Sequence, residues 1–161
     1  MQYYFTIYYV HLLVGKYLMF NYIKDSAVKK CIDLKSTLTP NRIDLLDLMI
    51  EIAKPLSAYE IKEYVKNNGN DLNISTIYRV MEFWCKNGVI HKISSLNKYT
   101  TCSNPEEVHL HIVNVCTNCE KLTETCNKRM GLDFKKGSKS LGLNISPNSH
   151  IEIPVICMEC Q

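Results

Sequence analysis

The stretch from His91 to Glu124 reads HKISSLNKYTTCSNPEEVHLHIVNVCTNCEKLTE. It combines imidazole, thiol and carboxylate side chains, which are the ligand types that zinc prefers in proteins. A further pair of cysteines, Cys157 and Cys160, follows near the C-terminal end of the sequence. We interpret this part of the chain as the holder of two zinc ions with different roles. One ion would staple a domain together, and the other would fix the angle between that domain and the one before it.

The composition is that of a globular protein with one large or two small domains. The chain has 161 residues, of which 46% are hydrophobic and 22% are charged, and this excludes an intrinsically disordered protein. Its net charge of +3 is too small to indicate a nucleic-acid binder by itself, so that assignment needs a motif. The eight cysteines are typical of metal ligands in a cytoplasmic protein rather than of disulfides in a secreted one, because four of them form Cys-x-x-Cys pairs and histidines lie nearby.

The two Cys-x-x-Cys pairs predict a structural zinc site. Each pair follows a segment with strand character, and a turn there lets two sulfur atoms converge on one ion. Four thiolates close the tetrahedral coordination of zinc and leave no position for a substrate. A redox role is the alternative, but a redox Cys-x-x-Cys needs a βαβ context that this sequence does not offer. The predicted ligands are Cys116, Cys119, Cys157 and Cys160.

Two helices with clear start signals are expected in the first half of the chain. Thr39 is a candidate N-cap with Pro40 at the first helical position, and Pro55 ends this helix. Ser57 followed by Glu60 forms a capping box, which predicts the start of the next helix. Both segments carry apolar residues at helical spacing, so both are expected to bury one face.

A third helix and a hairpin complete the first domain. Ser75 is expected to cap a helix over residues 76–87, and Gly88 is a typical helix C-terminal signal. Residues 89–94 and 98–102 alternate as two strands of a hairpin. Three helices followed by a hairpin predict a winged helix-turn-helix whose third helix enters the major groove of double-stranded DNA.

The domain boundaries follow from changes in composition. Residues 1–23 form a tyrosine-rich extension whose only charged residue before position 24 is Lys16, and its uncharged run is too short to span a bilayer. A spurious upstream start with Met19 as the true one, an extra helix, and a membrane anchor are the three interpretations left open. The DNA-binding domain is expected over residues 24–103, beginning with a short amphipathic helix, and the second domain over residues 104–161.

The second domain is expected to be a small α/β unit. Three segments have strand character, and Pro154 in the last of them predicts an edge position. The helix between the second and third strands is weakly predicted, because Gly131 and Gly137 interrupt it. The strands are predicted over residues 108–115, 120–125 and 151–156, and the helix over residues 127–141.

A second candidate zinc site draws its ligands from both domains. The two hairpin strands offer one ligand each, the segment after the hinge offers a histidine, and the neighbouring strand offers a carboxylate. None of these residues is diagnostic alone, but together they would lock the orientation of the two domains. The predicted set is His91, Cys102, His109 and Glu124, with His111 and Cys126 as rival ligands.

Residues 38–161 resemble the ferric uptake regulator family and, within it, the zinc uptake regulator branch. The resemblance is carried by the segments LTPNR, LSAYE, TIYR and GVIHK and by both Cys-x-x-Cys pairs. It implies a homodimeric, metal-dependent repressor with a winged helix followed by an α/β dimerisation domain. It also implies that the mixed ligand set above is the regulatory site and that the four cysteines hold structural zinc. The positions that it assigns to DNA contact are Tyr59 and Arg79, and we also expect Thr76 and Tyr78 to contact the DNA.

We therefore predict an α+β protein that acts as a zinc-responsive transcriptional repressor of zinc uptake genes. It is expected to bind two zinc ions per chain and a palindromic operator as a homodimer, with no membrane, no small-molecule substrate and no enzymatic activity. An iron- or peroxide-responsive repressor is the alternative within the family, although the histidine-rich run of iron regulators is reduced here to His109 and His111. A zinc enzyme or a thiol oxidoreductase is the alternative outside it.

Overall fold

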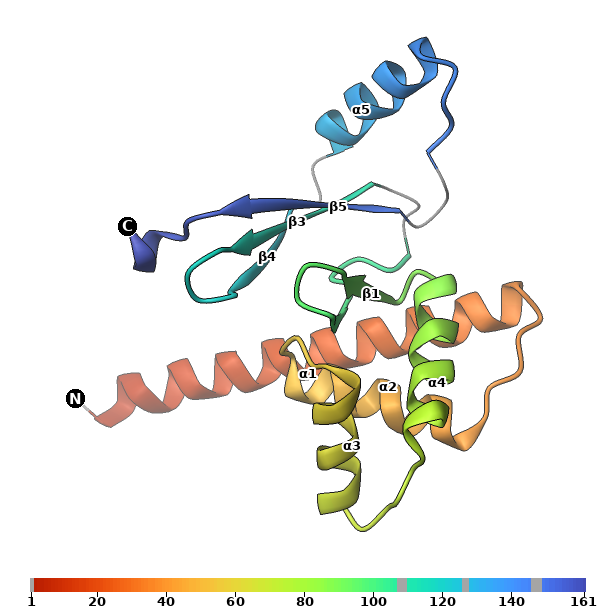
Figure 1. The fold of residues 1–161 in the computed structure, drawn as a ribbon. Coiled ribbons are helices and arrows are strands. Elements are labelled where there is room, and N and C mark those ends of the chain that lie inside the picture. Colours follow the sequence, from red (N-terminus) through yellow and green to blue (C-terminus); the bar gives the residue numbers. More distant parts are fainter. Residues whose placement is uncertain (1, 107–109, 126–127, 146–148) are drawn as a thin grey trace.

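The computed structural model describes residues 2–106, 110–125, 128–145 and 149–161. Two units are visible in Figure 1: a helical one that holds the first four helices and a hairpin, and a second one built on a three-stranded sheet with one helix. The predicted α+β class is confirmed. Within the part of the chain that the structure describes, no helix is both long enough and apolar enough to cross a membrane.

Helix α1 (Gln2–Asp33) is longer than the short amphipathic helix expected from residue 24 onward. Its C-terminal half buries Ile23, Ala27 and Cys31 against the first domain. These residues are four apart and therefore lie on one face of the helix. The N-terminal half extends past the domain in Figure 1, and Tyr17, Leu18 and Met19 near the middle of the helix are exposed.

Three further helices form the core of the first domain: α2 (Pro40–Ile52), α3 (Ala58–Asn67) and α4 (Ile74–Lys86). The capping box is confirmed, because Ser57 Oγ accepts a hydrogen bond from Glu60 N and Glu60 Oε2 accepts one from Ser57 N. The predicted Ser75 cap is wrong. Helix α4 begins earlier, since Asn73 Oδ1 accepts a hydrogen bond from Ser75 N at 3.2 Å and so caps the helix.

The hairpin consists of β1 (Ile90–Ile93) and β2 (Lys98–Thr101), which pair antiparallel as expected. Gly88 adopts φ +63° directly after α4, which confirms the helix C-terminal signal, because this left-handed conformation favours glycine. A bridge between Leu56 and Tyr99 ties β2 to the start of α3. Three helices and a tethered hairpin give the winged-helix arrangement predicted from the sequence.

The second unit contains β3 (His111–Cys116), β4 (Leu122–Thr125), α5 (Lys128–Ser140), β5 (His150–Val155) and the short 3-10 helix η1 (Met158–Cys160). The strand order is β4-β3-β5, with β3 antiparallel to β4 and parallel to β5. Strand β5 is thus an edge strand, which confirms the position predicted from Pro154. In Figure 1, α5 lies on the side of the sheet away from the first domain.

The hairpin of the first domain packs directly on the sheet of the second. Ile93 is fully buried and shares an apolar cluster with Val113 and Val115 of β3. Leu96 from the hairpin turn and Leu122 from β4 complete this cluster. The two units are therefore joined by buried apolar contacts as well as by the connecting chain.

Candidate metal centres and nucleic-acid interface

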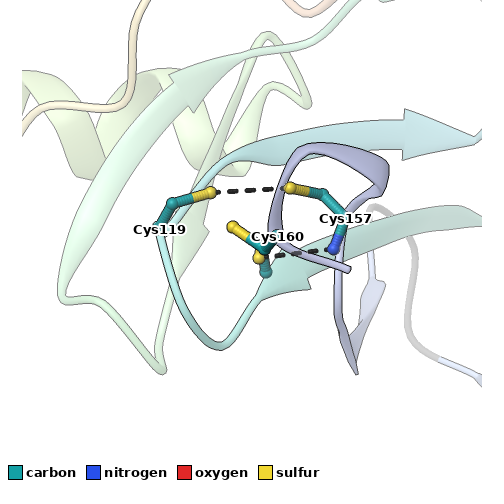
Figure 2. A group of neighbouring side chains, drawn as sticks. Cys119, Cys157 and Cys160 are labelled. Carbon is teal, nitrogen blue, oxygen red and sulfur yellow. Dashed lines mark hydrogen bonds between the residues drawn. The ribbon is translucent and has the colours of Figure 1, made fainter.

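The four predicted structural ligands converge at one end of the sheet. Cys116 ends β3 and Cys119 lies in the turn before β4, whereas Cys157 directly precedes η1 and Cys160 is its last residue. Their sulfur atoms all lie within 4.8 Å of one another. The Cys119 and Cys157 sulfur atoms are 3.7 Å apart, and the edge of a tetrahedron with zinc–sulfur bonds of about 2.3 Å is about 3.8 Å. Figure 2 shows how the loop that carries Cys119 faces the segment of Cys157 and Cys160 across this cluster.

The thiols of this cluster are strongly perturbed in opposite directions. A backbone N–H of Cys157, 3.4 Å from Cys116 Sγ, is the main cause that lowers the pKa of Cys116 to about 6. By contrast, the pKa of the Cys160 thiol is raised to about 12, mainly by the side-chain hydrogen bond between Cys160 and Cys157. Four thiolates crowded together repel one another, and a divalent cation removes that repulsion. The donor set therefore fits a structural zinc ion.

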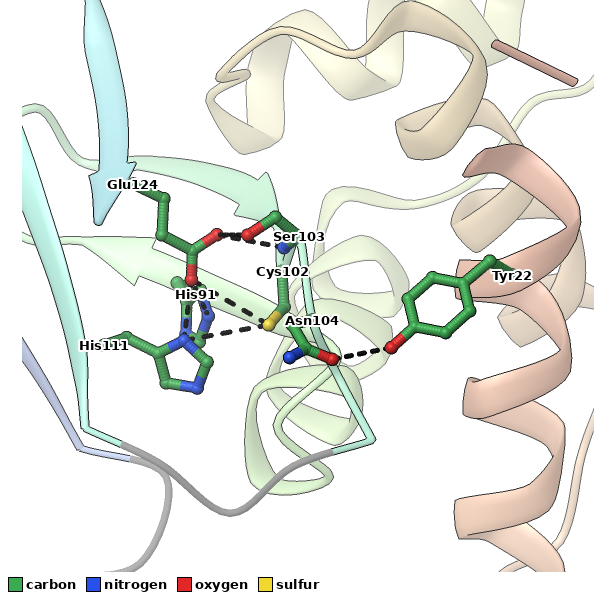
Figure 3. Close-up of polar contacts among 7 residues, drawn as sticks. All are labelled: Tyr22, His91, Cys102, Ser103, Asn104, His111 and Glu124. Carbon is green, nitrogen blue, oxygen red and sulfur yellow. Dashed lines mark hydrogen bonds and ion pairs between the residues drawn. The ribbon is translucent and has the colours of Figure 1, made fainter. Parts of the chain in front are cut away.

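A second cluster lies where the two units meet. It joins His91 of β1 and Cys102, which follows β2, to His111 at the start of β3 and Glu124 in β4. One ligand atom from each of these side chains lies within 4.8 Å of every other. Figure 3 shows the four side chains pointing toward a common centre.

Among the described residues, the structure brings His111 into this cluster. His109, which the sequence-based set contained, and Cys126, a rival ligand, lie outside the described residues. The sequence had offered His111 only as an alternative, because His109 and His111 both follow the hinge and spacing does not separate them. The assignment of His109 thus stays a prediction.

The distances in the mixed cluster are close to those of a zinc site. Cys102 Sγ lies 3.7 Å from His111 Nδ1 and 3.9 Å from Glu124 Oε1, and a tetrahedral zinc site has a sulfur–nitrogen edge of about 3.6 Å. His91 Nε2 lies 3.6 Å from the same Glu124 oxygen. His111 Nδ1 and Glu124 Oε1 are 2.6 Å apart, which is a hydrogen-bond distance. A metal ion would take the place of the proton in that bond.

The protonation states also suit metal binding. Burial is the main cause that lowers the pKa of His91, which keeps its imidazole neutral. Burial alone would raise the pKa of Glu124, but the neighbouring side chains of His111, His91 and Ser103 together hold it far below its usual value. Neutral imidazole and ionised carboxylate are the forms that coordinate zinc. His91 Nε2 is buried without a hydrogen-bond partner, and bonding to an ion would remove that cost.

Ser103 is a supporting residue that the sequence did not reveal. Its backbone N–H and its hydroxyl both donate to Glu124 Oε2, at 2.9 and 2.6 Å. The other carboxylate oxygen, Oε1, faces the cluster. Hydrogen bonds of this kind orient metal ligands. The only signal in the sequence was the position of Ser103 directly after Cys102, in a segment that we interpreted only as a domain boundary.

The residues expected at DNA lie on the outer surface of the first domain. Tyr59 at the start of α3 is exposed, as are Tyr78 and Arg79 on α4, whereas Thr76 is half-buried. The opposite face of α4 is anchored, because the indole Nε1 of buried Trp84 donates to the backbone oxygen of Arg42 in α2 at 2.9 Å. The role of the four residues in DNA contact stays a prediction.

Comparisons with known proteins agree with this picture. The family model described as "Ferric uptake regulator family" matches residues 33–150. The zinc uptake regulation protein of Escherichia coli K12 is 26% identical over 135 residues, which cover 83% of this chain and 78% of that protein. A zinc uptake regulator complexed with zinc and DNA has a TM-score of 0.74 at 24% identity, with 88% of this chain and 94% of the other covered.

Two structures of XcZur also match this chain. Holo XcZur has a TM-score of 0.71 and apo XcZur one of 0.52, each at 24% identity with 88% of this chain and 97% of the other covered. The likeness extends to the winged-helix and dimerisation domains of these structures. Because the family model covers most of the sequence, from the end of α1 to the start of β5, the chain belongs to the ferric uptake regulator family.

Proposed function

We propose that the protein is a zinc-responsive transcriptional repressor that binds operator DNA as a homodimer and controls zinc uptake genes. The observation that carries this proposal is the mixed cluster of His91, Cys102, His111 and Glu124. Two of its ligands belong to the winged-helix domain and two to the sheet of the dimerisation domain. An ion bound there couples metal concentration to the angle between the domains.

The ligand chemistry favours zinc as the signal. A buried thiolate, Cys102, suits zinc better than iron(II) or manganese, which prefer nitrogen and oxygen ligands. Four protein ligands fill a tetrahedral site, and a catalytic zinc needs an open position. The cluster therefore fits a sensor better than an enzyme. Zinc shifts the protein toward the DNA-binding arrangement to the extent that it binds this arrangement more tightly than the others.

The dimer is proposed to form through the second domain. Helix α5 and the segment after it expose several large apolar side chains, which a single chain leaves in water. These residues are Leu132, Phe134, Leu141 and Leu143. A second copy covering this surface would place two winged helices at a fixed separation. That separation matches a palindromic operator with two half-sites.

Metal analysis tests the proposal, with two classes of zinc expected. The purified protein should contain two zinc ions per chain, since the described residues hold two candidate ligand clusters. Mild chelation should remove the ion of the mixed site, because one thiolate, one carboxylate and two neutral imidazoles hold zinc less tightly than four thiolates. Operator binding, measured by fluorescence anisotropy, should be lost in the same step and return with added zinc.

The zinc ion bound by the four cysteines should stay in place during mild chelation. The protein should then remain a folded dimer in size-exclusion chromatography. A single zinc ion per chain, removed in one step with loss of folding, would contradict the division into two classes. Operator binding that does not depend on zinc would contradict the proposed role of the protein as a zinc sensor.

Arg79→Ala is expected to weaken operator binding by about 1–3 kcal/mol and to relax sequence preference. The exposed guanidinium on α4 offers a bidentate donor pair that suits guanine. Binding to the operator and to a scrambled duplex is compared at fixed salt. Lys29→Ala is the control, because this exposed lysine on α1 lies outside the recognition helix and should leave the preference between the two duplexes intact. An Arg79→Ala protein that binds its operator as tightly as the parent would rule out this contact.

A further inference from the structure

The turn of the hairpin is held by a carboxylate of the other domain. Glu152 lies on β5, and its two oxygens accept hydrogen bonds from consecutive backbone N–H groups of the turn. Ser94 N lies 2.6 Å from Oε1 and Ser95 N lies 3.0 Å from Oε2. Hydrogen bonds to an ionised acceptor are stronger than neutral ones, and a bidentate pair fixes direction as well as distance.

We propose that Glu152 is a positioning residue for the zinc response, acting as a latch that holds the hairpin in its zinc-binding position before zinc arrives. This inference rests on the proposed function, because it concerns how readily the mixed cluster forms. The latch needs no metal. It acts on the hairpin that carries His91 and leads to Cys102, whereas His111 and Glu124 belong to the domain of Glu152.

Two further contacts seat the same hairpin on the sheet. Ile93 and Leu96 pack against the apolar face of β3 and β4 described above. On the outside, Lys98 Nζ lies 3.1 Å from Glu120 Oε2 in an exposed ion pair. The turn thus lies against the second domain, and two of its amides donate to Glu152 there. In this arrangement the hairpin turn is a connection between the domains rather than a free DNA-contacting wing.

Glu152 is also connected to the mixed cluster through His150. His150 lies two residues before Glu152 on β5, so both side chains are on the same face of the strand. His150 Nε2 lies 3.2 Å from Glu152 Oε1. The ring of His150 in turn lies 5.7 Å, centroid to centroid, from the ring of His91. Glu152 therefore holds the strand of His91 through the turn that follows it and through the imidazole packed beside it.

The consequence is a higher apparent affinity for zinc. Zinc binds tightly only when the hairpin lies against the sheet, because the ligands come from both. If the hairpin swings free, the fraction of molecules competent to bind zinc falls, and the apparent affinity falls by the same factor. The latch raises that fraction without touching the ion. It also leaves the final complex unchanged, since zinc itself holds the same arrangement once bound.

Glu152→Ala is expected to raise the zinc concentration for half-maximal operator binding about tenfold. At saturating zinc the operator affinity should return to that of the parent. Buffered zinc titrations monitored by fluorescence anisotropy give both quantities. Glu152→Gln keeps one amide oxygen as an acceptor and should fall between the parent and the alanine variant. Hydrogen exchange should show the amides of Ser94 and Ser95 protected in the parent and unprotected in Glu152→Ala.

Glu120→Gln is the matched control, because it removes the exposed ion pair across the same hairpin. Such pairs contribute little, so the zinc midpoint should shift less than about twofold. A Glu152→Ala midpoint equal to that of the parent, or a loss of operator binding that excess zinc does not restore, would overturn the latch. A parent that does not respond to zinc would instead refute the proposed function, so the two failures are distinguishable.

Discussion

Cys102→Ser is expected to abolish zinc-dependent operator binding while leaving a folded dimer. Serine replaces a buried thiolate with a hydroxyl that stays protonated at neutral pH and is a poor zinc ligand. The loss of regulatory zinc affinity should exceed about a hundredfold, the upper end of the effect of altering a residue that only supports a ligand. The four cysteines at the other end of the sheet are untouched. The protein should therefore keep its structural zinc and its melting temperature but leave its target promoters active.

The same titration identifies the histidine of this site. His111→Ala should behave like Cys102→Ser, because His111 Nδ1 lies 3.7 Å from Cys102 Sγ and 2.6 Å from Glu124 Oε1. His109→Ala is the matched control, and it should retain the zinc response. The opposite result, with His109 required and His111 dispensable, would restore the ligand expected from the family resemblance. Full zinc-dependent binding by Cys102→Ser would end the assignment of the mixed cluster as the sensor.

The parts of the sites that the sequence predicted are those set by local geometry. In each Cys-x-x-Cys pair a turn lets two sulfur atoms face one ion, and the structure brings the two pairs together as the sequence predicted. The alternation of apolar and polar residues over positions 89–102 predicted the pairing of the two hairpin strands. This pairing brings the segments of His91 and Cys102 together. The sequence also predicted Glu124 on the strand beside β3.

The parts that the sequence did not predict depend on distant contacts. The choice between His109 and His111 depends on the path of the chain after the hinge, and spacing does not describe that path. Glu152 reads as an ordinary residue of an edge strand, and its partners Ser94 and Ser95 lie 58 and 57 residues away. Nothing local marks such a contact. The length of α1 escaped prediction for another reason: its apolar N-terminal half lacks both a cap and a helical pattern of polar residues.

Cys116→Ser is expected to unfold the dimerisation domain rather than merely silence the sensor. Cys116 ends the central strand β3, and the ion that it helps to bind ties this strand to the segment after β5. Among the described residues of the second domain, few apolar side chains besides Cys116 are buried, namely Leu110, Ile112, Val113 and Val115, so this domain has a thin apolar core. Small metal-stapled domains draw much of their folding free energy from the ion.

The melting temperature of Cys116→Ser should fall by more than about 10 °C, as expected when a small domain loses a structural metal ion. Zinc content should drop, and the dimer should dissociate or aggregate. Cys85→Ser is the matched control, since this half-buried thiol in α4 belongs to neither cluster and its replacement should change the melting temperature by only a few degrees. Circular dichroism melts, metal analysis and size-exclusion chromatography on both variants decide the point.

If Cys116→Ser melts at the same temperature as the parent and keeps its zinc, the four cysteines do not hold the second domain together, and this domain must be stable without their ion. If it instead unfolds while Cys102→Ser does not, stability and sensing are carried by different ions, because the two substitutions remove the same chemical group from two clusters at opposite ends of one sheet.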